Sequence, residues 1–197
     1  YKRQNMIPRN LYDSDHEMFR DSVRKFIEVE AMPHHDQWEK DGMVSDEVWL
    51  KAGEQGFLGL AVPEEFGGVN TDFRYNCILN EEIARSGCTG LGWTLHNDIS
   101  VPYIVRYGSD FQKKKYLPRC ASGELITAIA MTEPAAGSDL QGTKTTAVLD
   151  GDHYILNGSK TFITNGQKAG LVIVVAKTDT TAGSKGCLLY TSPSPRD

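Results

Sequence analysis

The spacing of the apolar residues changes once along this chain, close to Leu125, and this change limits the possible folds more than any other feature. Before it, apolar side chains recur at three- and four-residue intervals, the pattern of helices with one buried face. After it, short segments rich in β-branched residues alternate with turn residues, the pattern of strands. The predicted fold class is therefore α+β, with an all-α helical domain over residues 1–124 and an antiparallel β domain over residues 125–178.

Capping residues indicate where the helices of the first part begin. Ser14 stands three residues before Glu17, which is the spacing of a capping box, and Pro33 is expected to end this first helix. A Ser or Asp in front of an apolar repeat predicts further helix starts in the same way. Further helices are predicted to begin at Ser45, at Asp72, near Leu95 and at Ser109 or Asp110, the last ending near Leu117 and Pro118.

Turn residues separate the segments that follow Leu125. Strands are predicted at residues 125–131, 143–149, 153–156, 161–164 and 171–176. Asp150-Gly151-Asp152 lies between two of them, as a tight hairpin requires, and Asn157-Gly158 and Asn165-Gly166 are predicted to supply positive-φ positions at two more turns. Residues 179–197 are rich in Thr, Ser, Gly and Pro, so we expect them to be disordered.

The composition argues against several classes of protein. Lys and Arg number 21 against 26 Asp and Glu spread along the 197 residues, for a net charge of −5, so no basic face for nucleic acid is expected. No apolar run approaches the roughly 20 residues that cross a bilayer, so no transmembrane segment is expected. The cysteines lie far apart and read as reduced thiols, and the adjacent His34 and His35 point in different directions, so no metal site is predicted.

Residues 130–142 form the segment most suggestive of ligand binding, placed where a strand gives way to a loop. Small residues there allow the backbone to approach a ligand closely, while Thr132 and Ser138 offer hydroxyl groups. Such a loop suits an electron-rich ring or a phosphate. The alternative is an ordinary strand exit with an Asx or Ser turn, and the spacing by itself names no ligand.

Two segments together resemble the acyl-CoA dehydrogenase family. Residues 130–142, read as Ala-Met-Thr-Glu-Pro-Ala-Ala-Gly-Ser-Asp-Leu-Gln-Gly, are similar to the family's signature segment, and residues 156–166 are similar to its second flavin segment. The resemblance extends from about Leu11 to Lys177 and is strongest toward the long-chain, mitochondrial branch, with Pro33-His34-His35 and Trp38-Glu39-Lys40 among the matching stretches. It implies a helical N-terminal domain, a barrel-like middle β domain and a C-terminal four-helix domain.

The resemblance also implies an FAD site and assigns residues to it. Thr132 is expected to bond the pyrimidine side of the flavin, Phe162 to pack on the ring, Thr164 to bond near N5, and Ser138 to touch the acyl-CoA substrate as well. Glu133 is expected to be structural, and the alternative for Phe162 is ordinary β-domain core. The residues expected to bind the cofactor are Ile129, Ala130, Met131, Thr132, Glu133, Gly137, Ser138, Phe162, Ile163 and Thr164.

The implied reaction is α,β-dehydrogenation of a long-chain fatty acyl-CoA to a trans-2-enoyl-CoA in fatty acid β-oxidation. A carboxylate removes the α-proton, a hydride leaves to the flavin, and the electrons pass to electron-transfer flavoprotein. The resemblance further implies a homotetramer in the mitochondrial matrix. Two alternatives stay open, namely an acyl-CoA oxidase on the same scaffold and a non-catalytic module that binds flavin or CoA.

The chain departs from the family in its length and in its last residues. Family members are roughly twice as long and carry the catalytic Glu in the C-terminal helical domain, so no catalytic residue is assigned here. We expect the chain to be an N-terminal fragment that is inactive alone. Residues 179–197 do not resemble the family, and their end reads as translated sequencing adapter, so this tail is expected to be non-native.

Overall fold

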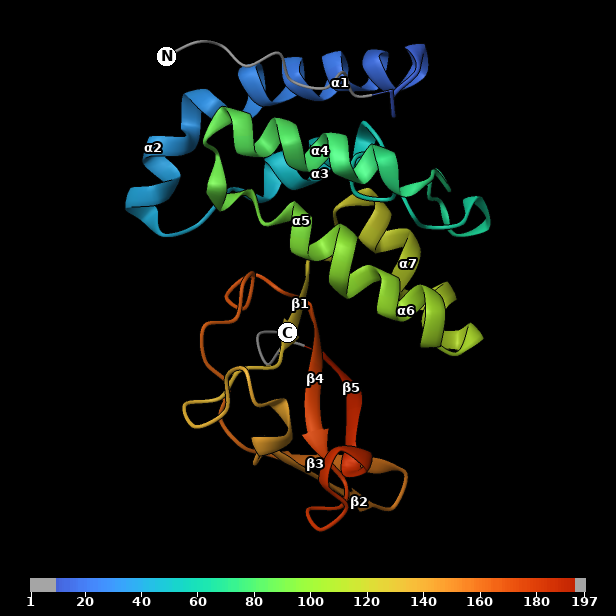
Figure 1. Ribbon diagram of the computed structural model, residues 1–197, viewed down its shortest axis with the longest axis vertical. Helices are drawn as coiled ribbons and strands as arrows, with labels where there is room; N and C mark the ends of the chain where they lie inside the picture. Colours follow the sequence, from blue (N-terminus) through green and yellow to red (C-terminus); the bar gives the residue numbers. More distant parts are fainter. Residues whose placement is uncertain (1–9, 194–197) are drawn as a thin grey trace.

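The computed structural model describes residues 10–193 and stacks helices above a small sheet (Figure 1). Helices α1 to α4 form the upper layer, α5 to α7 lie beneath them, and the strands extend below (Figure 1). The α-helices are α1 Ser14–Phe26, α2 Met32–Asp41, α3 Asp46–Glu54, α4 Phe73–Ser86, α5 Trp93–Leu95, α6 Val101–Tyr107 and α7 Asp110–Ser122. Short π-helices at Ile27–Ala31 and His96–Ser100 and short 3-10 helices at Glu64–Phe66, Thr89–Leu91, Leu140–Gly142 and Gly183–Gly186 complete the helical elements. None of the helices within residues 10–193 combines the length and apolarity needed to cross a membrane.

Helix starts agree well with the capping residues, with one exception. Ser45, Asp72 and Ser109 each accept a hydrogen bond from a backbone N–H of the first turn, so these predictions are confirmed. At α1 the cap is Asp13, not Ser14, because the Asp13 side chain accepts from the backbone of Asp15 and His16. The capping box is therefore formed by Asp13 with His16, and Glu17 has no part in it.

Proline does not stop the helices as predicted. Pro33 lies in the first turn of α2, where a missing N–H costs nothing, so the helical path continues from α1 through the π-helix Ile27–Ala31 to Asp41. Pro118 lies inside α7, which runs on to Ser122. One face of the helix beside Pro118 is buried through Leu117, Cys120 and Ala121, and this packing outweighs the lost backbone hydrogen bond.

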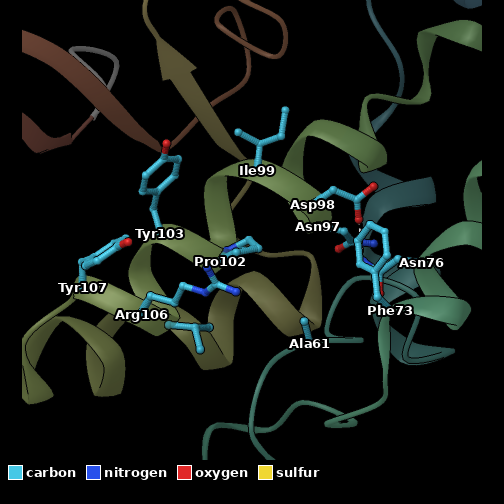
Figure 2. A pocket seen from close by; sticks show the side chains of 11 residues that line it. Ala61, Phe73, Asn76, Asn97, Asp98, Ile99, Pro102, Tyr103, Arg106 and Tyr107 are labelled. Atoms are coloured by element: carbon cyan, nitrogen blue, oxygen red, sulfur yellow. Dashed lines mark hydrogen bonds between the residues drawn. The ribbon is translucent and has the colours of Figure 1, made fainter.

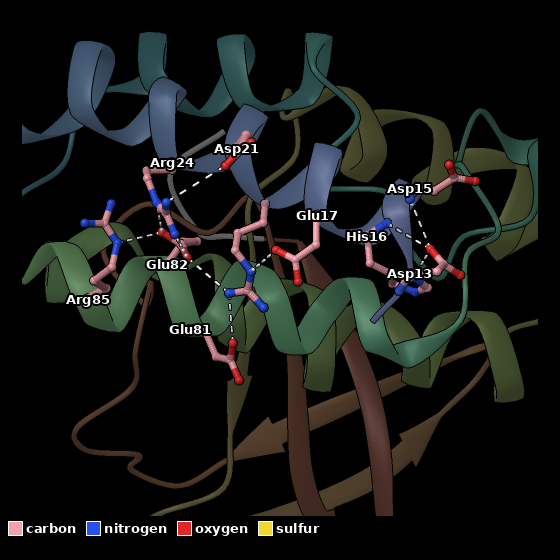
Figure 3. A network of polar contacts seen from close by, with 10 residues as sticks. Asp13, Asp15, His16, Glu17, Asp21, Arg24, Glu81, Glu82 and Arg85 are labelled. Carbon is pink, nitrogen blue, oxygen red and sulfur yellow. Dashed lines mark hydrogen bonds and ion pairs between the residues drawn. The ribbon is translucent and has the colours of Figure 1, made fainter. Parts of the chain in front are cut away.

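An aromatic and aliphatic core joins the upper helices. Trp49 and Trp93 are fully buried and pack edge to face with ring centroids 6.4 Å apart. At the outer side of this core, the buried Glu82 on α4 accepts hydrogen bonds from Arg20 and Arg24 on α1 and from Arg85 on its own helix (Figure 3). These ion pairs fix α1 along α4.

The predicted order of a helical part followed by a sheet is confirmed, but the sheet is mixed and not antiparallel throughout as predicted. The strands are β1 Thr127–Ala130, β2 Thr146–Asp150, β3 His153–Asn157, β4 Leu171–Lys177 and β5 Cys187–Pro193. β4 pairs in parallel with β1 on one side and with β2 through a single pair of residues, whereas β2–β3 and β4–β5 are antiparallel. The parallel pairing buries alternate residues of β4 against β1, which strand composition cannot distinguish from antiparallel pairing.

Two further predictions about the β region are corrected. Residues 161–164 form a loop and not a strand. The tail is not disordered over Cys187–Pro193, because β5 pairs with β4 along its whole length and Thr191 accepts a hydrogen bond from Gln112 of α7. The segment that forms β5, Cys-Leu-Leu-Tyr-Thr-Ser-Pro, is less polar than the tail as a whole, and the open edge of β4 offers it backbone partners. Residues 194–197 lie outside the described part of the chain.

Candidate functional site

The segment predicted to bind a ligand begins where β1 leaves the core. All four β1 residues are buried, including Ile129 and Ala130, whereas Met131 and Thr132 are half-buried and Gly137 and Ser138 are exposed. A tight turn follows at once, because Glu133 and Ala136 exchange backbone hydrogen bonds of 2.9 and 3.1 Å. The chain thus passes from a fixed strand to an exposed loop within a few residues.

Glu133 anchors this loop, in agreement with its predicted structural role. Its side chain is 5% exposed and accepts hydrogen bonds from the backbone N–H of Lys144 at 2.7 Å and from the N–H and hydroxyl of Thr145 at 3.0 and 2.5 Å. Burial raises the pKa of the Glu133 carboxyl, but these donors and the Lys160 ammonium lower the pKa to about 2. The carboxylate is therefore ionised, and its hydrogen bonds hold the loop in place.

The structure brings the two predicted flavin segments together. The backbone N–H of Thr161 donates to the carbonyl of Thr132 at 3.0 Å. The Lys160 ammonium donates to the carbonyl of Met131 and to the Glu133 carboxylate, both at 2.9 Å. Residues that lie some 30 positions apart in the sequence thus form one continuous surface.

Phe162 lies on that surface and not in the core. Its side chain is 93% exposed, which excludes the alternative of β-domain packing, and its φ of 55° is rare for a bulky residue. Beside it, Ile163 is half-buried and Thr164 is exposed. An aromatic ring held outward on a strained backbone is typical of a binding position.

Asn165 fixes the far end of this segment. It adopts a φ of 63°, as predicted for its turn, and its side-chain amide donates to the carbonyls of Gly92 at 3.1 Å and Thr127 at 3.2 Å. The Asn157-Gly158 turn behaves differently, because Gly158 has no positive φ. Glycine is required there for space, since a Cβ would collide with Thr145.

A buried histidine joins the helices to β1 beside the site. His96 accepts from the Thr127 N–H and hydroxyl through Nδ1 and donates through Nε2 to the carbonyl of Cys120 at 3.1 Å. Burial lowers the pKa of His96 to about 4, so the ring is neutral. His96 is thus a core histidine with both ring nitrogens hydrogen-bonded.

A separate pocket of about 570 Å³ opens on the helical side (Figure 2). Asp98 at its wall accepts hydrogen bonds from the side chains of Asn76 at 2.5 Å and Asn80 at 2.6 Å. Phe73, Ile99 and Tyr103 supply apolar surface. None of the predicted flavin residues lines this pocket, and no sequence motif pointed to it. Its size suits an organic ligand with a substantial apolar part.

Sequence reasoning left the supporting residues without a role. Lys160 and Asn165 stand inside the second segment, yet their partners lie in β1, in the loop between β1 and β2, and at Gly92 directly before α5. The one sequence signal was the single Lys in the second segment, but nothing in the sequence indicated that Glu133 would accept a hydrogen bond from it.

Comparison with known proteins adds independent information. Residues 13–124 match the family described as acyl-CoA dehydrogenase, N-terminal domain, and residues 128–195 match acyl-CoA dehydrogenase, middle domain. The second match extends to residue 195, so the expectation that residues 179–197 do not resemble the family is wrong for most of that tail. The chain is 53% identical over 176 residues to the long-chain specific acyl-CoA dehydrogenase, mitochondrial, of Sus scrofa, which confirms the predicted similarity to the long-chain branch. That alignment covers 89% of this chain and 41% of the pig protein, so the chain spans about two fifths of this curated relative.

Solved structures share the fold. The crystal structure of acyl-CoA dehydrogenase from Geobacillus kaustophilus superposes with a TM-score of 0.92 at 51% identity, covering 95% of this chain and 50% of that one. An acyl-CoA dehydrogenase from Bacillus anthracis complexed with FAD superposes with a TM-score of 0.82 at 35% identity, covering 96% and 33%. Because the two family models together match residues 13–124 and 128–195, the chain belongs to the acyl-CoA dehydrogenase family.

Proposed function

We propose that the whole protein is an FAD-dependent dehydrogenase that converts fatty acyl-CoA thioesters, long-chain ones above all, to trans-2-enoyl-CoA in β-oxidation. One observation carries the proposal: the loop after β1 and the loop after β3 are bonded to each other through Thr161 and Thr132, and together they hold Phe162 outward. A flat ring with a polar edge fits beside such a surface, because the surface combines one aromatic side chain with nearby hydroxyl groups.

The residues present fit a flavin. Phe162 gives an aromatic wall with 93% of its side chain exposed. Thr132 is half-buried and Thr164 is exposed, so their hydroxyls are available as donors, Thr132 toward the pyrimidine side and Thr164 near N5. When bound, FAD supplies the hydride acceptor that the dehydrogenation requires. The chain's own part is to bind and orient the ring and to offer fixed hydrogen-bond donors to it.

Ser138 is the proposed contact with the acyl-CoA. It is exposed at the tip of the loop after β1, next to Gly137, whose surroundings leave open space for an approaching ligand. The base that removes the α-proton is proposed to be a glutamate outside these 197 residues. Electron-transfer flavoprotein as the electron acceptor, a homotetrameric assembly and a mitochondrial matrix location complete the proposal, supported by the similarity to mitochondrial long-chain enzymes.

A direct assay tests the proposal on the purified whole protein. We expect a bound flavin spectrum and anaerobic reduction of an artificial dye that depends on long-chain acyl-CoA. Strong acyl-CoA-dependent peroxide formation in air with little dye reduction would support the oxidase instead. Flavin or CoA binding without turnover would support the non-catalytic module, and absence of both flavin and CoA binding would contradict all three functions.

A further inference from the structure

Lys160 is a partly buried cation that the proposed function leaves without a role. Its side chain is 11% exposed, and its ammonium lies between two acceptors on a single loop, the Met131 carbonyl and the Glu133 carboxylate, each at 2.9 Å. The next residue, Thr161, donates its backbone N–H to Thr132 at 3.0 Å. Two consecutive residues are thus fixed to residues 131–133, directly before the exposed Phe162.

The acceptor side of this link is itself rigid. The Glu133 carboxylate also accepts from Lys144 N–H at 2.7 Å and from the Thr145 hydroxyl at 2.5 Å, at the start of β2. On the donor side, Gly158 lies so close to Thr145 that no side chain would fit between them. Lys160 therefore joins two segments that are each already held in place.

From this geometry we infer that Lys160 and Glu133 are positioning residues, which fix the separation of Thr132 and Phe162 and so preorganise the two walls that receive the flavin. The inference rests on the proposed function, because it takes the ligand of this surface to be FAD. Neither side chain needs to touch the ring. Each acts through the backbone of the neighbouring residue, which is Thr132 for Glu133 and Thr161 with Phe162 for Lys160.

The charges of the pair make the inference testable. Lys160 and Glu133 together are neutral, so they add little net charge to the surface. Removing Lys160 alone leaves an uncompensated buried carboxylate, which disfavours an electron-rich ring nearby, whereas removing both charges restores neutrality but not the link. One double-mutant cycle can therefore separate the effect of losing the link between the two segments from the effect of losing the charge balance.

The experiment uses the whole protein and the variants Lys160→Met, Glu133→Gln and the double variant. Lys144→Met is the matched control, because this neighbouring lysine side chain is exposed. FAD dissociation constants come from flavin fluorescence, midpoint potentials from dye-coupled titration, and folding from melting curves. We expect Lys160→Met to weaken FAD binding about tenfold and to lower the flavin midpoint potential. The double variant should have the midpoint potential of the unsubstituted protein but should still bind FAD about tenfold more weakly.

Other results overturn the inference. If the double variant folds and binds FAD within about threefold of the Lys144→Met protein at an unchanged potential, the pair does not position the flavin walls. If Lys160→Met does not fold, the double variant alone decides, since it contains no uncompensated buried charge. If the unsubstituted protein binds no FAD, the proposed function itself fails, and with it this inference.

Discussion

Replacing Glu82 by Gln should measure how strongly the buried ion pairs hold α1 on α4. The Glu82 side chain is 2% exposed and accepts from Arg20 at 3.1 Å, from Arg24 at 3.0 Å and from Arg85 at 2.7 Å (Figure 3). Burial raises the pKa of Glu82, but the guanidinium groups lower it from 4.5 to about 2. Glutamine keeps the shape and removes the charge that these arginines need.

The expected loss follows from the pKa. A fall from 4.5 to about 2 corresponds to about 3 kcal/mol, at about 1.4 kcal/mol for each pH unit. Arg24 and Arg85 are 38% and 47% exposed, so water screens part of this interaction. We therefore expect Glu82→Gln to lower the free energy of unfolding by about 2 kcal/mol near neutral pH.

The pH dependence gives the sign. Because the folded-state pKa of Glu82 lies below its unfolded value, the stabilisation is complete above about pH 4.5 and is lost as the pH falls toward about 2. Urea unfolding can be followed by the fluorescence of the buried Trp49 and Trp93. The difference in the free energy of unfolding between the unsubstituted protein and Glu82→Gln should become smaller at acid pH. The exposed Glu54→Gln is the control. A difference in the free energy of unfolding below about 0.5 kcal/mol, or one independent of pH, would show that these ion pairs do not hold α1 on α4.

Three further outcomes are expected. Gly53→Ala should lower stability by about 1 to 3 kcal/mol in a urea titration, because its Cβ would overlap the Ser122 carbonyl, whereas Gly137→Ala has open space and should change little; equal effects would contradict the packing. The His96 ring should stay neutral in NMR titrations down to about pH 5, since burial lowers its pKa to about 4. The contribution of the neutral ring to stability is therefore present above about pH 6.5 and lost as the pH falls through about 4. A titration midpoint near pH 6.5 would show that the ring is not buried. Phe162→Ala should weaken FAD binding about tenfold and leave the melting temperature of the FAD-free protein unchanged, because the side chain is 93% exposed. A lower melting temperature of the FAD-free protein would place Phe162 in the core.

Local features of the sequence were enough to predict much of this protein. The caps at Ser45, Asp72 and Ser109 and the hairpin around Gly151 depend on short-range hydrogen bonds and on a positive φ, which neighbouring residues determine by themselves. The family resemblance likewise came from residues contiguous in the chain. Such features need no knowledge of what packs against them.

Contacts between residues far apart in the sequence determined the remaining features, namely where helices end, how the strands pair and how the two loops are joined. Helices run past Pro33 and through Pro118 because of the first-turn position of one and the buried neighbours of the other. The parallel pairing of β1 with β4 depends on which strand edge is available in three dimensions. The same holds for the tail, which forms β5 because the edge of β4 is open to it. The link between Lys160 and Glu133 joins residues 27 positions apart, and a sequence contains no local signal for a bond that exists only once the sheet has formed.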